Sequence, residues 1–439
     1  MKHRIIISVF MLTACILQVS AQVPAVAPAQ KKQVILTGGT IHTGTGTVIE
    51  NGLVAFNGGK ITFVGKAVDY KQDKSTSEII DVTGKQVYPG LIFPNTNLGL
   101  IEIGSGVDVA SDDQETGDLN PNVRAIAAYN TDSHVIPVIR SNGILLAQIV
   151  PNGSLLPGTS SIVQLDAWNW KDAAYKMDNG IQLGWPRSSS AGARGGGQQA
   201  RPAAGTGSYD RNVEELEKIF TDAVAYAAID KPEDVNLRLE ALKGLFEGSK
   251  TLFISSSEPK GIIAAVSFAK RYGVRKVVLV GADEAAWAVK DFLRENNIPV
   301  LLDNPLSLPR YDYSDVRMPF KLAAMFSKEG ILVGLTYSKQ AYGNLPFAAG
   351  QTVPYGLTKE EALMTVTSNT AKILGIDDLT GSLETGKDAN IVVSTGDILD
   401  MATNNIELAF ITGRNISLDN KHKMLYRRFS EKYSQLKGN

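Results

Sequence analysis

From residue 87 onward, short apolar runs alternate with segments of helical periodicity, and this alternation restricts the fold more than any other feature of the chain. Short apolar runs bounded by turn-forming residues are typical of strands that are buried on both faces of a parallel sheet. Such runs occur at 143–150, 161–165, 251–254, 276–280, 299–302 and 331–335. The pattern predicts an α/β fold with a parallel sheet.

Amphipathic helices are expected between these runs. One apolar stripe at helical spacing extends from Val213 to Ala227, and another covers 262–269. Thr358 and Glu361 form a capping box, which predicts a final helix that continues through Leu374. Strand–helix units repeated over roughly 280 residues favour a (β/α)8 TIM-like barrel, with a doubly wound open sheet as the alternative.

A small β-layer is expected before the barrel. The segment 34–64 is rich in β-forming residues that are interrupted by glycine. Within it, Asn51-Gly52 and Asn57-Gly58 are dipeptides typical of hairpin turns.

The first residues have the features of an export signal. A basic start, MKHR, is followed by an uncharged apolar stretch, and small residues precede Gln22, so residues 1–21 are predicted to be removed. The apolar stretch is shorter than the roughly 20 residues that span a bilayer, and no transmembrane segment is expected in the mature chain. We therefore expect a periplasmic or secreted protein with a short linker at 22–33. Lipoprotein processing at Cys15 is the alternative.

The composition excludes several classes of protein. Lys and Arg number 44 against 45 Asp and Glu, which argues against a nucleic-acid partner because such proteins usually carry a basic excess. The single Cys excludes an internal disulfide and a thiolate metal cluster. The mature chain would have no Cys, which suits an oxidising compartment.

One segment, 188–207, has low complexity and lies between a predicted strand and a helix. In a barrel it would lie at the face where ligands bind, so a flap is one interpretation and an unstructured insertion is the other. Trp168, Trp170 and Trp185 precede it; we expect core packing for at least two of them and consider ligand stacking for the rest.

Motifs at both ends of the predicted barrel resemble those of a known family. Residues 84–99 read GKQVYPGLIFPNTNLG, and residues 381–394 read GSLETGKDANIVVS. Together with 356–375 and 406–413, these segments resemble the amidohydrolase superfamily, specifically its imidazolonepropionase-like and dihydroorotase-like branch. The resemblance implies a barrel at 89–376 whose flanks, 34–88 and 377–439, form one composite β-sandwich.

The resemblance also implies a zinc or other divalent metal at the barrel mouth, held by histidine and aspartate, where it would generate hydroxide. Other residues occupy these positions in this chain, namely Phe93, Asn95, Asn97, Ser255, Gly281, Thr336, Tyr337 and Ser338. Amides and hydroxyls are poor zinc ligands. We therefore expect no metal cofactor, no identifiable catalytic set, and a polar, uncharged pocket at the former metal positions.

The remaining histidines do not offer a substitute site. His3 would leave with the signal, and His42, His134 and His422 are expected on the surface or in satisfied hydrogen bonds. An oxygen-only site for Ca²⁺ or Mg²⁺ is the alternative, and a solvated acidic loop is the simpler interpretation. The residues concerned are Glu102, Asp108, Asp112, Asp113, Glu115 and Asp118.

Two functions from different classes remain. The first is an exported hydrolase that acts on non-peptide C–N bonds such as those of cyclic amides, as the resemblance implies. The second is a non-catalytic subunit that binds a small molecule and associates with itself or with an intact homologue. The substitutions at the metal-ligand positions favour the non-catalytic subunit on mechanistic grounds, while the family resemblance supports the hydrolase.

Overall fold

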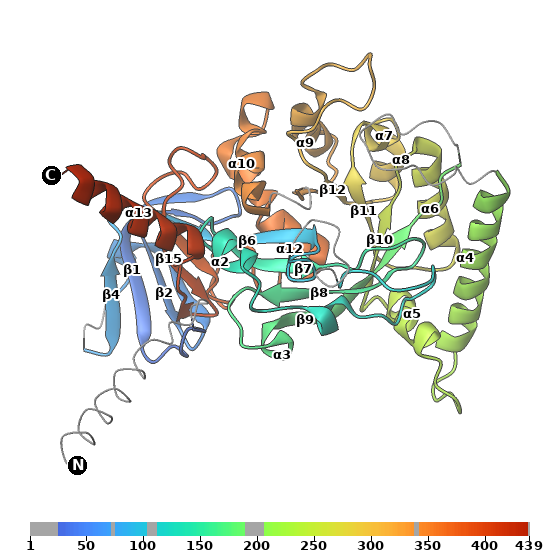
Figure 1. The fold of residues 1–439 in the computed structure, drawn as a ribbon, viewed down its shortest axis with the longest axis horizontal. Coiled ribbons are helices and arrows are strands. Elements are labelled where there is room, and N and C mark those ends of the chain that lie inside the picture. The colour runs from blue at the N-terminus through green and yellow to red at the C-terminus, as the bar shows by residue number, and fades with distance from the viewer. Residues whose placement is uncertain (1–24, 72–74, 103–111, 189–205, 338–341, 438–439) are drawn as a thin grey trace, which may run out of the picture.

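The computed structural model describes residues 25–71, 75–102, 112–188, 206–337 and 342–437. Two eight-stranded sheets form the molecule, and Figure 1 shows them side by side, with helices covering the second. The expected signal and Cys15 lie outside the described residues, as does nearly all of the segment 188–207.

The first sheet contains strands from both ends of the chain, in the order β16-β15-β14-β5-β1-β2-β3, with β4 paired to β1. Figure 1 shows the blue N-terminal and red C-terminal strands together. The strands are β1 (Gln33–His42), β2 (Val48–Asn57), β3 (Lys60–Lys66), β4 (Ser77–Asp81), β5 (Gln86–Pro89), β14 (Ile391–Ser394), β15 (Ile406–Ile411) and β16 (Arg414–Asn415).

The second sheet follows the order β13-β12-β11-β10-β9-β8-β7-β6 and is nearly closed into a barrel, as predicted. Its strands are β6 (Leu91–Thr96), β7 (Ile144–Ile149), β8 (Gly158–Gln164), β9 (Ala174–Gly184), β10 (Thr251–Ser255), β11 (Val277–Ala282), β12 (Val300–Leu302) and β13 (Val333–Leu335). The helices are α2 (Val135–Arg140), α3 (Trp170–Ala173), α4 (Thr206–Ala227), α5 (Leu237–Glu247), α6 (Pro259–Arg271), α7 (Glu284–Trp287), α8 (Lys290–Glu295), α9 (Met318–Lys328), α10 (Leu345–Gly350), α11 (Lys359–Met364), α12 (Ser368–Leu374) and α13 (Lys421–Lys437).

The family motifs join the two sheets. The amide of Gly90 in the PGLI motif donates to the carbonyl of Asn390 in the GKDAN motif, at 2.8 Å. A Cβ at Gly90 would lie 2.6 Å from Leu145 Cδ1, so only glycine fits this contact without displacing a neighbour. Asp388 forms a 2.7 Å ion pair with Lys60 and accepts a hydrogen bond from the Tyr175 hydroxyl. Both motifs therefore have structural roles.

Three local predictions are wrong. The run at 161–165 belongs to β8, which is antiparallel to both β7 and β9, so the barrel departs there from a regular (β/α)8 pattern. Asn51-Gly52 lies within β2, where an extra residue forms a β-bulge with Asn51 at φ 49°, and only Asn57-Gly58 makes a turn. The capping box at Thr358 is present, but the predicted single helix is divided into α11 and α12.

That division is what brings β6 and β13 together. No ladder joins these two strands among the described residues. Instead, the amide of Ile92 in β6 donates to the carbonyl of Val366 at 2.9 Å, and the amide of Leu335 in β13 donates to the carbonyl of Thr365 at 3.0 Å. The link between α11 and α12 thus bridges the first and last strands.

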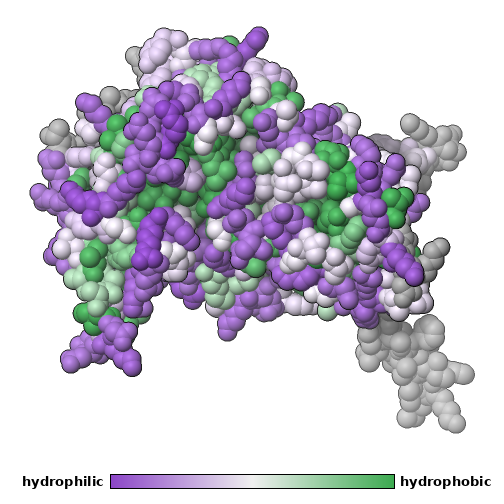
Figure 2. All heavy atoms as spheres, turned by 180° about the vertical axis from the view of Figure 1, so that it is seen from behind, coloured by the Kyte–Doolittle hydropathy of each residue, from purple (hydrophilic) through white to green (hydrophobic). Residues whose placement is uncertain are grey.

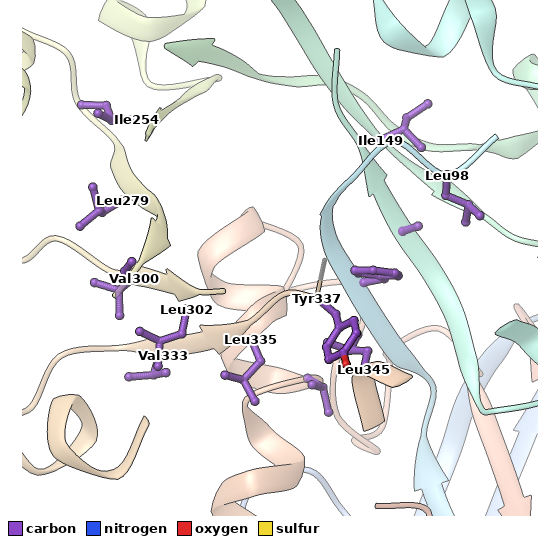
Figure 3. Packing of buried hydrophobic residues seen from close by; sticks show 14 of the residues in the cluster. Leu98, Ile149, Ile254, Leu279, Val300, Leu302, Val333, Leu335, Tyr337 and Leu345 are labelled. Carbon is purple, nitrogen blue, oxygen red and sulfur yellow. The ribbon is translucent and has the colours of Figure 1, made fainter. Parts of the chain in front are cut away.

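Alternate strand residues pack on the two faces of the barrel sheet. Inward-facing residues from six strands share one apolar cluster with Ile373, Leu374 and Ile376, so α12 and the residues after it fill the end where the strands begin. Outward-facing residues such as Ile254 and Leu335 pack with the surrounding helices in the main core (Figure 3). The interior is consequently solid at one end.

Asp166, which follows β8, is the centre of a buried ionic cluster. Its carboxylate contacts Arg140 NH1 at 2.6 Å and Arg414 NH1 at 2.8 Å, and the side chain of Asp166 is 1% exposed. It also accepts the amide of Ala27 at 3.0 Å. The cluster therefore connects the segment before β1, helix α2 and strand β16.

His42 at the end of β1 makes a second contact between the sheets. Its Nδ1 lies 2.6 Å from Glu360 Oε1 on α11, its Nε2 lies 2.9 Å from Gln86 Oε1, and its ring stacks on Tyr88. Burial acts to lower the pKa of His42, but the hydrogen bonds to Glu360 and Gln86 raise the pKa above 6.5. The histidine thus has satisfied hydrogen bonds.

None of the helices in the described ranges has both the length and the apolar character needed to cross a membrane. Seen from behind, the surface alternates hydrophilic and hydrophobic areas (Figure 2).

Replacing Asp166 with Asn should strongly destabilise the protein, because it leaves two arginines without a counter-charge in a buried position. We expect a loss of about 3–5 kcal/mol in the free energy of unfolding, measured by urea denaturation. The matched control is Glu217→Gln, which removes an ion pair with Arg271 whose side chains are 59% and 42% exposed and should cost less than about 1 kcal/mol. Equal effects of the two changes would contradict this account.

The His42 contact should stabilise the protein most at low pH. The pKa of His42 is higher in the folded protein than in the unfolded chain. The stability that the His42 contact contributes is therefore complete below the pKa of the unfolded state and is lost as the pH rises through the pKa of the folded state. The difference in melting temperature between the wild type and His42→Gln should therefore grow from about pH 8.5 to about pH 6. His134→Gln, at an exposed position before α2, is the control, and a difference independent of pH would refute the prediction.

Candidate functional site at the barrel mouth

Two of the predicted pocket residues face away from the barrel interior. Phe93 on β6 and Tyr337 after β13 both belong to the main apolar core outside the barrel, where Phe93 is fully buried. Figure 3 shows Tyr337 next to Leu345 of α10. Strand alternation explains this, since Ile92, next to Phe93, faces inward. Neither residue is among those that line the pocket described below.

The polar residues on β6 and after β13 make internal hydrogen bonds. Asn95 adopts φ 52°, a conformation that Asn tolerates, and its backbone N–H donates to Gln148 Oε1 at 3.1 Å. The buried side chain of Asn97 donates to Asp113 Oδ2 at 3.3 Å. Thr336 Oγ1 donates to the carbonyl of Pro94 at 2.8 Å and so connects β13 to β6. These three residues stabilise the strand ends.

A pocket of about 510 Å³ lies over the carboxyl ends of β9, β10 and β11. It includes Ser255 and Gly281, so the structure brings together two of the predicted residues. Ser338 lies outside the described residues. The remaining lining residues are Ser154, Leu155, Gly184, Trp185, Pro186, Arg187, Asn212, Ser256, Ser257, Val280, Asp283 and Arg310.

The pocket is charged, contrary to the prediction. Arg310 NH1 pairs with Asp283 Oδ2 at 2.6 Å, and its NH2 donates to the carbonyl of Ser257. Arg187 forms no ion pair with any residue in the described ranges. The lining residues thus carry one positive charge in excess. The sequence motifs point to neither arginine, because Arg187 precedes a low-complexity segment and Arg310 lies in the long connection after β12.

A buried polar layer lies below the pocket. Gln148 on β7 donates to Ser160 Oγ on β8 at 3.2 Å, and Ser160 donates to Asn179 Oδ1 on β9 at 3.1 Å. Gln182 on β9 is 8% exposed, and its Nε2 has no hydrogen-bond partner among the described residues. The inward positions thus change from apolar to polar toward the mouth. In the sequence, the one sign of this layer is that Gln148 and Gln182 each lie between apolar residues.

Of the three tryptophans, only Trp185 lines the pocket. It is 7% exposed and packs on Phe268, and its indole Nε1 has no partner among the described residues. Trp168 is exposed and Trp170 packs against the core. Both follow β8, and the antiparallel direction of β8 places them at the opposite end of the barrel. The pocket therefore offers several hydroxyl groups and an arginine.

Comparisons with known proteins agree with the motifs. A model described as the amidohydrolase family matches residues 320–416. The imidazolonepropionase of Bradyrhizobium diazoefficiens is 25% identical over 366 residues, covering 79% of this chain and 87% of that enzyme. The imidazolonepropionase of Bacillus cereus is 51% identical over 51 residues, 12% of each chain. The crystal structure of an amidohydrolase from Thermotoga maritima has a TM-score of 0.75 at 23% identity, covering 88% of this chain and 99% of that one.

These matches together support the amidohydrolase superfamily. Within the superfamily it is imidazolonepropionase-like. A zinc-bound adenosine deaminase from Xanthomonas campestris shares the fold, with a TM-score of 0.52 at 14% identity, covering 94% of this chain and 100% of that one.

The residues present do not fit the metal that the superfamily implies. Among the described residues, no group of three or more His, Cys, Asp or Glu side chains is placed to hold a metal ion. Asn97 and Thr336 already use their polar groups in hydrogen bonds, and Phe93 offers no donor atom. Of the acidic residues after β6, Asp113 contacts Asn97, Glu102 accepts a hydrogen bond from Asn130, and Asp108 lies outside the described residues. This donor set suits neither zinc nor a hydroxide-generating site.

Metal removal should therefore have little effect on this amidohydrolase-family protein. We expect purified protein to contain far less than one equivalent of transition metal by elemental analysis, and EDTA to leave its melting temperature unchanged. The double variant Asn95→His/Asn97→His should remain without tightly held zinc, because no third and fourth ligands are present. A stoichiometric ion, with a lower melting temperature after chelation, would overturn this interpretation.

Proposed function

We propose that this protein is an exported member of the amidohydrolase superfamily that binds a small, acceptor-rich ligand at the barrel mouth without metal–hydroxide chemistry. The observation that carries the proposal is the pocket over β9–β11. It presents Arg187 and the hydroxyls of Ser255 to Ser257 where relatives would need a metal. These groups suit a carboxylate or carbonyl oxygen.

A cyclic amide that carries a carboxylate side chain matches this chemistry. Its ring carbonyls would accept hydrogen bonds from the serine hydroxyls, and its carboxylate would pair with Arg187, because Arg310 is already paired with Asp283. The similarity to imidazolonepropionases supports a second candidate, a hydrolase of cyclic amides that works without metal hydroxide. For both candidates we propose export, because residues 1–21 have the features of an export signal. We also propose that the protein associates with itself or with an intact homologue. Mature protein beginning at Gln22 would support export by the expected cleavage.

The test compares hydantoin-5-propanoate with hydantoin, which lacks the carboxylate. We expect only the first to bind, by calorimetry, and to be recovered unchanged. Arg187→Gln should weaken binding by about tenfold to a hundredfold, since a charged hydrogen bond contributes about 1.5–3 kcal/mol. Arg271→Gln, an exposed arginine outside the pocket, is the control.

If the protein opens the ring of hydantoin-5-propanoate, and a metal chelator does not slow this reaction, the hydrolase candidate would be favoured. Binding of neither compound, or equal binding to wild type and Arg187→Gln, would reject the proposed ligand class.

A further inference from the structure

Helix α13 carries exposed aromatic side chains along one face. Tyr426, Phe429 and Tyr433 are separated by three and four positions, the spacing that places residues on one side of a helix. They are 75%, 47% and 59% exposed, and Met424 on the same helix is 48% exposed. A helix that only covered the core would turn these groups inward, so this face has no partner within the described chain.

The same helix is strongly basic, in a chain whose net charge is −1. Its residues with described side chains, 421–434, contain five Lys or Arg and one acidic residue, Glu431. Arg427 pairs with Asp419 at 2.7 Å. Lys421, Lys423, Arg428 and Lys432 form no ion pair with any described residue. The helix thus carries four uncompensated cations in addition to its aromatic face.

The base of α13 is fixed to the body, while its far end is free to meet a surface. Asn420 donates from Nδ2 to Ser141 Oγ at 3.2 Å and accepts the amide of Lys423 at 2.9 Å, so it anchors and caps the helix. In Figure 1 the helix extends beyond the first sheet to the edge of the molecule, away from the barrel. The barrel mouth is therefore not obstructed by whatever α13 binds.

We propose that α13 binds the surface of an anionic lipid bilayer, lying flat with Tyr426, Phe429 and Tyr433 at the level of the headgroups. The charge selects this partner, because a bilayer that contains anionic lipid attracts lysines and arginines along its whole plane. Tyrosine suits the position, since its ring is apolar and its hydroxyl remains hydrated. A basic helix with an aromatic face and low overall hydrophobicity is typical of interfacial binding. The proposal does not depend on the ligand proposed for the barrel.

The test uses the full mature protein and sedimentation with vesicles of phosphatidylcholine alone or mixed with phosphatidylglycerol. We expect at least about tenfold tighter binding to the anionic vesicles, weakened by salt. Tyr426→Ser/Phe429→Ser/Tyr433→Ser should lose most binding with an unchanged melting temperature, because these side chains are exposed. Val68→Ser/Val235→Ser/Met401→Ser removes exposed apolar groups elsewhere and should bind as the wild type does.

The charge contribution is tested separately. Lys421→Gln/Lys423→Gln/Arg428→Gln/Lys432→Gln should abolish the preference for anionic vesicles, whereas Lys218→Gln/Lys231→Gln/Lys260→Gln/Lys276→Gln, at exposed positions outside α13, should retain most of it. No binding to anionic vesicles, or equal binding by wild type and the triple serine variant, would overturn the proposal. A protein that does not bind vesicles but self-associates, and whose self-association is abolished in the triple serine variant, would also overturn the proposal. In that case α13 would pair with a second copy of the chain.

Discussion

Two backbone carbonyls, those of Thr365 and Val366, connect the first and last strands of the barrel sheet. Backbone groups that are buried without partners are costly, so β6 and β13 need this link in place of a direct ladder. The link also directs α12 into the end of the barrel where the strands begin, and Ile373 and Leu374 fill that end. The pocket over the ends of β9 to β11 lies toward the opposite end.

The superfamily motifs persist here because they stabilise the fold. Gly90 approaches Leu145 too closely for a side chain, and the GKDAN segment supplies backbone hydrogen bonds to β3 and to Gly90 and an ion pair to Lys60. These contacts are needed whatever reaction the barrel performs. The amide, hydroxyl and apolar side chains at the metal positions make structural contacts of their own, so the barrel remains intact without the metal ligands.

The two ends of the molecule offer different chemistry. The barrel mouth has one excess positive charge and several hydrogen-bond donors enclosed in a pocket, which suits a small acceptor-rich molecule. Helix α13 presents cations and aromatic rings on an open surface, which suits an extended anionic plane. The Asp166 cluster and the His42–Glu360 contact connect the first sheet with the barrel and its helices between these regions.

The sequence by itself determined the strand–helix order, the capping box at Thr358, the barrel class and the superfamily, because apolar periodicity, caps and motifs are local properties. It also identified Ser255 and Gly281 as residues at the barrel mouth. Only the tertiary structure decided the reversed direction of β8 and the outward orientation of Phe93 and Tyr337, since strand direction and facing depend on long-range pairing. The same holds for Arg187 and Arg310, which are far apart in the sequence and line one pocket because separate parallel strands end side by side.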